Sequence, residues 1–209
     1  AAPLMTLSLV VLVAAIVLIG GLAAYMFAQK PVTNVQQLLQ QHRYADAAAE
    51  AEKQRDELHR AEALKLLGRF DEAIAAYRRS DDPAAEEGIA LSLAHLGRDL
   101  DEAKRRMEQT IATHPAIQEF QALALAYILL RRGERDAALR LFDDNRVLLE
   151  TRFRDDYTDP DVLLAETLWL YGELSAAAGE AERAAALRTQ AAAWAPGSVW
   201  AERAGAGRA

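Results

Sequence analysis

The hydrophobic and polar positions divide the chain into two unlike parts. Residues 4–27 read LMTLSLVVLVAAIVLIGGLAAYMF, which is 24 uncharged and nearly all apolar residues, and the first charged residue is Lys30. Beyond it, residues that favour helices dominate, and no stretch alternates between apolar and polar with a period of two, as a strand with one buried face would. The pattern predicts an all-α protein in which one apolar helix precedes a polar helical domain.

The apolar run predicts a transmembrane anchor. About 20 apolar residues span a bilayer as a helix, which satisfies its own backbone groups in lipid. A cleaved signal peptide would have a shorter apolar core and a small-x-small cleavage site, whereas Met26-Phe27-Ala28 places Met at the −3 position. A buried core helix would need a large domain around it. We therefore expect residues 1–29 to form the anchor, with residues 4–27 in the bilayer. Gly20 and Ala24 form a small-xxx-small pair that permits contact with another membrane helix.

A recurring pattern follows the anchor. In the stretch from Gly68 to Tyr77, a Gly ends one helix, Phe70 and two acids open the next, and Ala73 lies four residues before Tyr77. Gly at a helix end adopts the left-handed conformation without steric cost, and acids in a first turn complement the helix dipole. The small Ala lets two helices approach, and the large residue fills the groove between hairpins. The corner recurs at His42, Gly97, Gly133 and Gly179, and the small residue at Ala47, Ala103, Ala138 and Ala184.

This pattern predicts four to five helical hairpins, stacked as an α-solenoid over residues 30–197. A generic Ala-rich bundle is the alternative, but it would not require the recurrent spacing. The small residues are 26, 30, 35 and 46 positions apart, so we expect short helices in the first two hairpins and an insertion over residues 147–161. Pro115 and Pro196 lie where second helices should stop. Residues 198–209 are expected to form a short cap, in which Trp200 covers the last hairpin, and a loose tail.

On these residues the chain resembles the tetratricopeptide repeat (TPR) family, whose unit is a 34-residue helix-turn-helix. The match is best at Gly68, Phe70, Ala73 and Tyr77, and the Trp of the family's first helix is missing from most copies. The resemblance implies a concave face, lined by the first helix of each hairpin, that binds proteins or peptides. Carried over by register, it implies these partner-binding residues: Glu62, Lys65, Glu87, Tyr127, Arg131, Trp169 and Glu173.

Tyr127 and Trp169 are the expected anchors of that face, because large aromatic side chains carry much of the energy of an interface. Ordinary packing between repeats is the alternative, and it is the favoured one for Trp169. Arg131 and Arg132 either pair with an acidic partner or lie at a solvated helix end. The family's carboxylate-clamp pattern of Lys and Asn is not present in this groove, which argues against a receptor for chaperone tails.

Charge and composition exclude several classes of function. The chain has 24 basic and 31 acidic residues, a net charge of −7 and no Cys. The acidity argues against nucleic acid as the main partner, and the lack of Cys excludes disulfides, thiol nucleophiles and thiolate zinc sites. The four His residues lack helical metal spacing. The loop from Asp155 to Asp161 lacks the Gly and Glu of a calcium loop, so we interpret it as a linker in which Asp159 or Asp161 caps the next helix. We expect no catalytic site, cofactor or metal.

These features predict a membrane-anchored scaffold or an accessory subunit of a larger membrane complex, with integral membrane proteins as partners. The alternative is a transient assembly or quality-control factor, similar in layout to the membrane-bound TPR factors of bacterial cytochrome c maturation and secretion. An enzyme with an unrecognised site is a third hypothesis. The expected location is the bacterial inner membrane. Lys30 and Arg43 follow the span, and positive residues on that side favour a cytoplasmic domain. A basic tail before Ala1 would reverse this charge difference. We expect a periplasmic domain.

Overall fold

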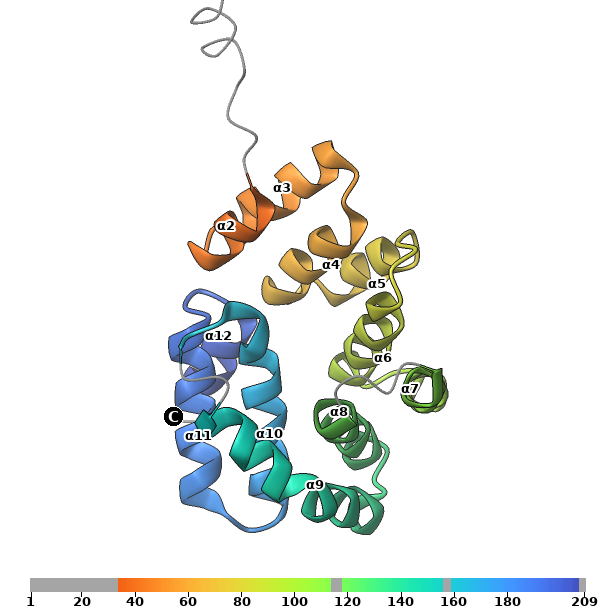
Figure 1. Ribbon diagram of the computed structural model, residues 1–209, viewed down its shortest axis with the longest axis vertical. Helices are drawn as coiled ribbons and strands as arrows, with labels where there is room; N and C mark the ends of the chain where they lie inside the picture. Colours follow the sequence, from red (N-terminus) through yellow and green to blue (C-terminus); the bar gives the residue numbers. More distant parts are fainter. Residues whose placement is uncertain (1–33, 114–117, 156–158, 207–209) are drawn as a thin grey trace, which may run out of the picture. The chain divides into compact units, whose positions relative to one another are not determined.

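The computed structural model describes residues 34–113, 118–155 and 159–206, which form helices joined by short turns (Figure 1). In these three ranges there are eleven α-helices and one short 3-10 helix, and no β-strand. The prediction of an all-α fold is therefore confirmed for this part of the chain. The helices belong to one structural unit that begins at Val35.

Ten of the helices pair into five consecutive hairpins. The first helices of the hairpins are α2 (Val35–Gln40), α4 (Glu57–Leu66), α6 (Ala84–Leu96), α8 (Gln118–Arg131) and α10 (Ala165–Ala177). The second helices are α3 (Tyr44–Gln54), α5 (Phe70–Tyr77), α7 (Leu100–Thr113), α9 (Arg135–Asp155) and α11 (Ala181–Trp194). The 3-10 helix η1 (Val162–Leu164) precedes α10, and α12 (Val199–Ala206) follows the last hairpin. Each first helix contacts the first helix of the next hairpin, so the hairpins stack in sequence order.

The hairpin corners have the backbone conformation that the sequence pattern predicts. Gly97 ends α6 with φ +68°, and the peptide N–H groups of Gly97 and Arg98 donate to the last carbonyls of the helix at 3.1 and 3.3 Å. His42, which replaces Gly at the first corner, adopts φ +60°. Because side chains disfavour this left-handed conformation, Gly is the usual residue at such a corner. The other predicted corners, also at positive φ, are Gly68, Gly133 and Gly179.

The recurrent small residues lie in the core. None of them has more than 1 % of its surface exposed, and the large residues four positions later in three hairpins are also buried. A methyl group at each of these positions lets neighbouring helices approach closely, while the larger side chain fills the adjacent groove. The small residues are Ala47, Ala73, Ala103, Ala138 and Ala184, and the large ones are Tyr77, Met107 and Phe142.

The stack closes on itself, because the first two hairpins touch the last one. Gln40 donates to the carboxylate of Asp161 at 3.2 Å, and the hydroxyl of Tyr44 donates to the carbonyl of Pro196 at 3.1 Å. Helix α12 contacts α10, α11 and also α4. Trp200 of α12 is fully buried, with its ring centroid 4.9 Å from that of His95 and 6.2 Å from that of Trp169. The predicted short cap is thus a two-turn helix that closes the stack.

The structure defines two features of the C-terminal half that the sequence left open. The expected insertion over residues 147–161 is largely a continuation of α9, which is 21 residues long and ends at Asp155. The stretch contains no Gly or Pro before Asp155 to stop the helix, and Arg146 pairs with Glu150 one turn later. After α9, Asp161 caps η1 by accepting a hydrogen bond from the N–H of Leu163 at 3.0 Å. The sequence had left Asp159 and Asp161 as alternatives for this cap.

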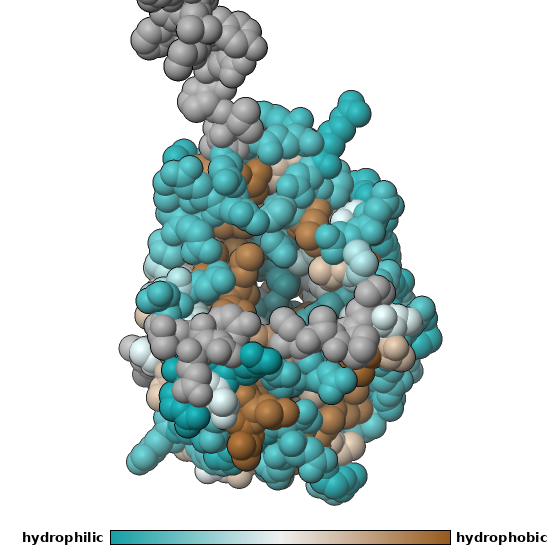
Figure 2. Space-filling view, in the orientation of Figure 1, coloured by the Kyte–Doolittle hydropathy of each residue, from teal (hydrophilic) through white to brown (hydrophobic). Residues whose placement is uncertain are grey.

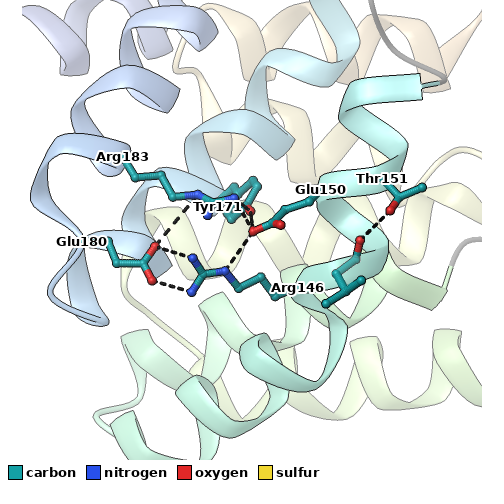
Figure 3. A network of polar contacts seen from close by, with 7 residues as sticks. Arg146, Glu150, Thr151, Tyr171, Glu180 and Arg183 are labelled. Atoms are coloured by element: carbon teal, nitrogen blue, oxygen red, sulfur yellow. Dashed lines mark hydrogen bonds and ion pairs between the residues drawn. The ribbon is translucent and has the colours of Figure 1, made fainter.

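Polar side chains of α9, α10 and α11 connect the last two hairpins (Figure 3). Arg146 donates to Glu150 at 3.0 Å and forms a two-point ion pair with Glu180. Arg183 donates to the same oxygen of Glu150 at 2.7 Å and to the hydroxyl of Tyr171. The charged side chains of this network are between 28 % and 38 % exposed. Solvent therefore screens these pairs, and each contributes little stability by itself.

The predicted single-pass membrane architecture is corrected by the structure. In the part of the chain that it describes, no helix combines the length and the apolar character that a bilayer crossing demands. The longest of the described helices, α9, carries charged residues in every turn. Residues 1–29, with the expected bilayer segment 4–27 and the contact pair Gly20 and Ala24, lie outside the described residues.

Replacing Trp200 by Ala is expected to lower the free energy of unfolding by about 3–5 kcal/mol, because it empties a large buried aromatic site. Chemical denaturation followed by circular dichroism measures this change. Glu202→Ala, on the exposed side of the same helix, is the matched control and should change the free energy by less than about 0.5 kcal/mol. A loss below about 1 kcal/mol for Trp200→Ala would show that α12 is not part of the core.

Candidate functional site

A buried carboxylate on the last hairpin, that of Glu166, contacts two earlier hairpins of the stack. Glu166, in the first turn of α10, is 7 % exposed. One of its oxygens accepts a hydrogen bond from Lys65 on α4, 101 residues earlier in the chain, and the other pairs with Nε2 of His95 on α6 at 2.8 Å. Glu166 thereby connects the second, third and fifth hairpins. A buried carboxylate that is paired on both oxygens avoids most of the cost of desolvation.

The contacts of His95 determine which of its nitrogens carries the proton. A carboxylate only accepts hydrogen bonds, so Nε2 of His95 is the donor to Glu166. The other nitrogen, Nδ1, then accepts from the hydroxyl of Tyr127 at 3.2 Å and from the guanidinium of Arg203 at 3.2 Å. Arg131 donates to the same hydroxyl at 3.1 Å. The His95 side chain has no exposed surface, so it lies at the buried centre of this chain of hydrogen bonds.

The charges of this group follow from burial and pairing. Burial opposes ionisation of Glu166, but the charge of Lys65 and the hydrogen bond from His95 outweigh it and lower the pKa of Glu166 to about 2. Burial also opposes the charge of Lys65, yet the attraction of Glu166 raises the pKa of Lys65 above its ordinary value. Burial lowers the pKa of His95 against the opposing effect of Glu166, which keeps His95 neutral at pH 7.

A cavity of about 200 Å³ lies beside Glu166 and Lys65. Side chains from all first helices except α2, together with α5 and η1, line it. Figure 2 shows a hollow in the helical unit, bordered by both hydrophilic and hydrophobic surface. The polar lining residues include Glu62, Lys65, Glu87 and Glu166, and the apolar ones include Leu91, Phe120, Ala124, Leu163 and Leu170.

Two carboxylates of the cavity lack a partner among the described residues. Oε2 of Glu62 is buried and accepts no hydrogen bond, and no hydrogen bond or ion pair holds Glu87. Burial raises the pKa of both carboxyls above the ordinary value, although the nearby charge of Lys65 opposes the shift. These two side chains are therefore poised to accept a proton or to meet a positively charged group.

The structure brings three of the seven predicted partner-binding residues together, since Glu62, Lys65 and Glu87 all line the cavity. Tyr127 and Arg131 lie apart from them, in the hydrogen-bond chain that continues from His95. Tyr127 is 2 % exposed, so in this conformation it is a core residue and does not present an anchor to a partner.

The remaining two predicted residues, Trp169 and Glu173, lie further along α10. Trp169 is 7 % exposed and packs against Trp200, with the guanidinium of Arg188 5.5 Å from its ring centroid. This agrees with the alternative of packing between repeats. Glu173 accepts a hydrogen bond from Arg188 at 3.0 Å and thus joins α10 to α11.

Sequence reasoning missed the residues that organise the site, His95 and Glu166. Each is a titratable residue within a largely apolar helical stretch, GIALSLAHL in α6 and AETLWLY in α10. A polar side chain at such a buried position requires a partner, and this signal could have been used. In the described ranges no three His, Asp or Glu side chains are arranged to hold a metal ion.

No protein-family model matches this sequence, and no curated protein matches it significantly. The resemblance to TPR proteins therefore stays a prediction from the residues. The structural observation on which the functional argument depends is the cavity and its two unpartnered carboxylates.

Replacing Glu166 by Gln is expected to lower the free energy of unfolding at pH 7 by about 3–5 kcal/mol, because it leaves the nearly buried ammonium of Lys65 without its counter-ion. The pKa of Glu166 in the folded protein, about 2, is below its ordinary value of 4.5. Its contribution is therefore complete above the ordinary value and is lost as the pH falls towards 2. The difference between wild type and variant should shrink over this range.

Denaturant titrations at several pH values measure this difference. Glu173→Gln is the matched control on the same helix, because its partly exposed pair with Arg188 should contribute less than about 1 kcal/mol. A Glu166→Gln effect as small as that of the control, or one that does not depend on pH, would contradict the assignment.

Proposed function

We propose that the protein is an interaction module, a stack of helical hairpins that holds a segment of a partner protein at the cavity beside Glu166. The cavity is the observation that carries the proposal. It combines side chains from four first helices, which the TPR resemblance implies as the binding face, and it brings together Glu62, Lys65 and Glu87 from two different hairpins. Binding at one cavity would therefore engage residues that only the folded stack places side by side.

The size of the cavity favours a protein segment over a free small molecule. Sites for drug-sized ligands and cofactors have volumes of about 300–1,000 Å³, whereas this cavity has about 200 Å³. It suits one side chain of a larger ligand. Leu163, one of the large apolar side chains that are exposed, lies at the cavity and is 39 % accessible. Protein interfaces combine apolar contacts at the centre with a polar rim, and Leu163 supplies an apolar contact beside the charged side chains.

Ala84 offers a way to close the cavity without disturbing the core. It lines the cavity at the start of α6 and its side chain is exposed. Ala84→Trp should therefore obstruct the cavity while the protein still folds. Ala75→Trp, at an exposed position of α5 that does not line the cavity, is the matched control.

Tagged wild-type protein and both variants would be isolated gently from their native cells, and the proteins retained would be quantified by mass spectrometry. We expect Ala84→Trp to reduce the retained partner by about tenfold or more, which corresponds to about 1.4 kcal/mol, while Ala75→Trp retains it. Equal melting temperatures would verify that the variants are folded. A partner retained equally by all three proteins would contradict the cavity as the binding site.

A further inference from the structure

The charges around the cavity do not balance. Its lining contains three carboxylates, Glu62, Glu87 and Glu166, and one ammonium group, that of Lys65. Lys65 forms its ion pair with Glu166, which also accepts from His95. The positive charge of Lys65 is thus already used, and two carboxylates remain.

The described surroundings of Glu62 and Glu87 do not supply the missing charge. On α4, Nδ1 of His59 donates to the carboxylate of Asp56 at 2.7 Å, and this pair faces Glu62 together with Lys65 and Glu166. Among the described residues, the charged groups that face Glu87 on α6 are Lys65 and Glu166. A half-buried carboxylate without a hydrogen-bond donor carries a desolvation cost, which a positive ligand would remove.

The other half of the lining is apolar. Leu91 and Leu170 approach the cavity from α6 and α10, and Phe120 from α8. Methylene groups of a ligand would be buried against these side chains, which removes apolar surface from water. Aromatic rings such as that of Phe120 also attract a nearby cation. Apolar walls with a negative end are the chemistry that fits a long side chain with a positive terminus.

A metal ion fits this site less well than an organic cation. Calcium takes six to eight oxygen ligands, and in the described residues no three acidic or His side chains are arranged to hold a metal. The ammonium of Lys65 would also repel a divalent ion close to it. A lysine or arginine side chain needs only one or two carboxylates and brings its own apolar stem.

We infer that the cavity binds the positively charged side chain of a lysine or arginine in the partner segment, between the carboxylates of Glu62 and Glu87. This inference rests on the proposed function and specifies the chemistry of the ligand. Lys65 and Glu166 hold the site in place, and the apolar lining receives the stem of the side chain.

The probe for a direct test is n-butylammonium, which reproduces the end of a lysine side chain, with n-butanol as its neutral counterpart. Both would be titrated into the protein of residues 1–209 at pH 7.5 while amide chemical shifts are recorded by NMR. We expect n-butylammonium to shift amides of α4 and α6 with a Kd on the order of 1–10 mM. The double variant Glu62→Gln/Glu87→Gln should weaken this binding at least about tenfold, whereas the exposed-site control Glu182→Gln should not.

Thermal unfolding provides a second readout that also reveals misfolding. The pKa values of Glu62 and Glu87 are raised in the folded state, so their ionisation destabilises the fold and protonation at lower pH restores stability. The double variant should therefore melt about 2–4 °C above the wild type at pH 7.5. This gain should shrink as the pH falls, because the wild-type carboxyls become protonated.

The outcomes separate this inference from the proposed function. Equal shifts by n-butylammonium and n-butanol, or binding that survives the double substitution, would overturn cation recognition. If Ala84→Trp still releases the partner in that case, the cavity remains the binding site for a different side chain. Retention of the partner by Ala84→Trp would instead refute the proposed function itself.

Discussion

The carboxylate of Glu166 is the constraint on which the arrangement of the helices depends. It lies almost out of reach of solvent, and its two oxygens are held by Lys65 from the second hairpin and His95 from the third. A buried charge of this kind is stable only when every partner is in place. The pairing therefore acts on the stack as a whole, because it joins residues 101 positions apart. Packing of Trp200 beside His95 adds a second, apolar closure at the same place.

Closure of the stack also creates the cavity and determines its charge. Because Glu166 neutralises Lys65, the neighbouring carboxylates of Glu62 and Glu87 stay without a counter-ion. A protein selected only for stability would not keep two half-buried acids in this state, since replacing them by amides would remove an electrostatic cost. A binding site that is less stable when empty than when occupied provides a reason for them. The ion pair between Lys65 and Glu166 thus determines that Glu62 and Glu87 have no counter-ion among the described residues.

Local signals predicted the hairpins well. Corner residues such as Gly97 and small residues such as Ala103 act through contacts within one hairpin, so their spacing is visible in the sequence. The closure of the stack was not predicted. Lys65 and Glu166 meet only when four hairpins have stacked, and no local sequence pattern indicates a contact between residues 101 positions apart. Register placed Glu62 and Glu87 on the inner face, but their lack of partners depends on where Lys65 points. The extension of α9 was not predicted, because the irregular repeat spacing indicated an insertion over residues 147–161 but not its conformation.

The most direct test of this account is a carboxyl NMR titration of the glutamates in the intact protein. It measures the pKa values of Glu62, Glu87 and Glu166 under the same conditions, before any ligand is known. The account predicts that Glu166 titrates near pH 2, while Glu62 and Glu87 titrate above the ordinary value of 4.5. Titration of all three carboxyls close to that ordinary value would show that Glu166 is not paired in a buried site and that the cavity carries no uncompensated charge.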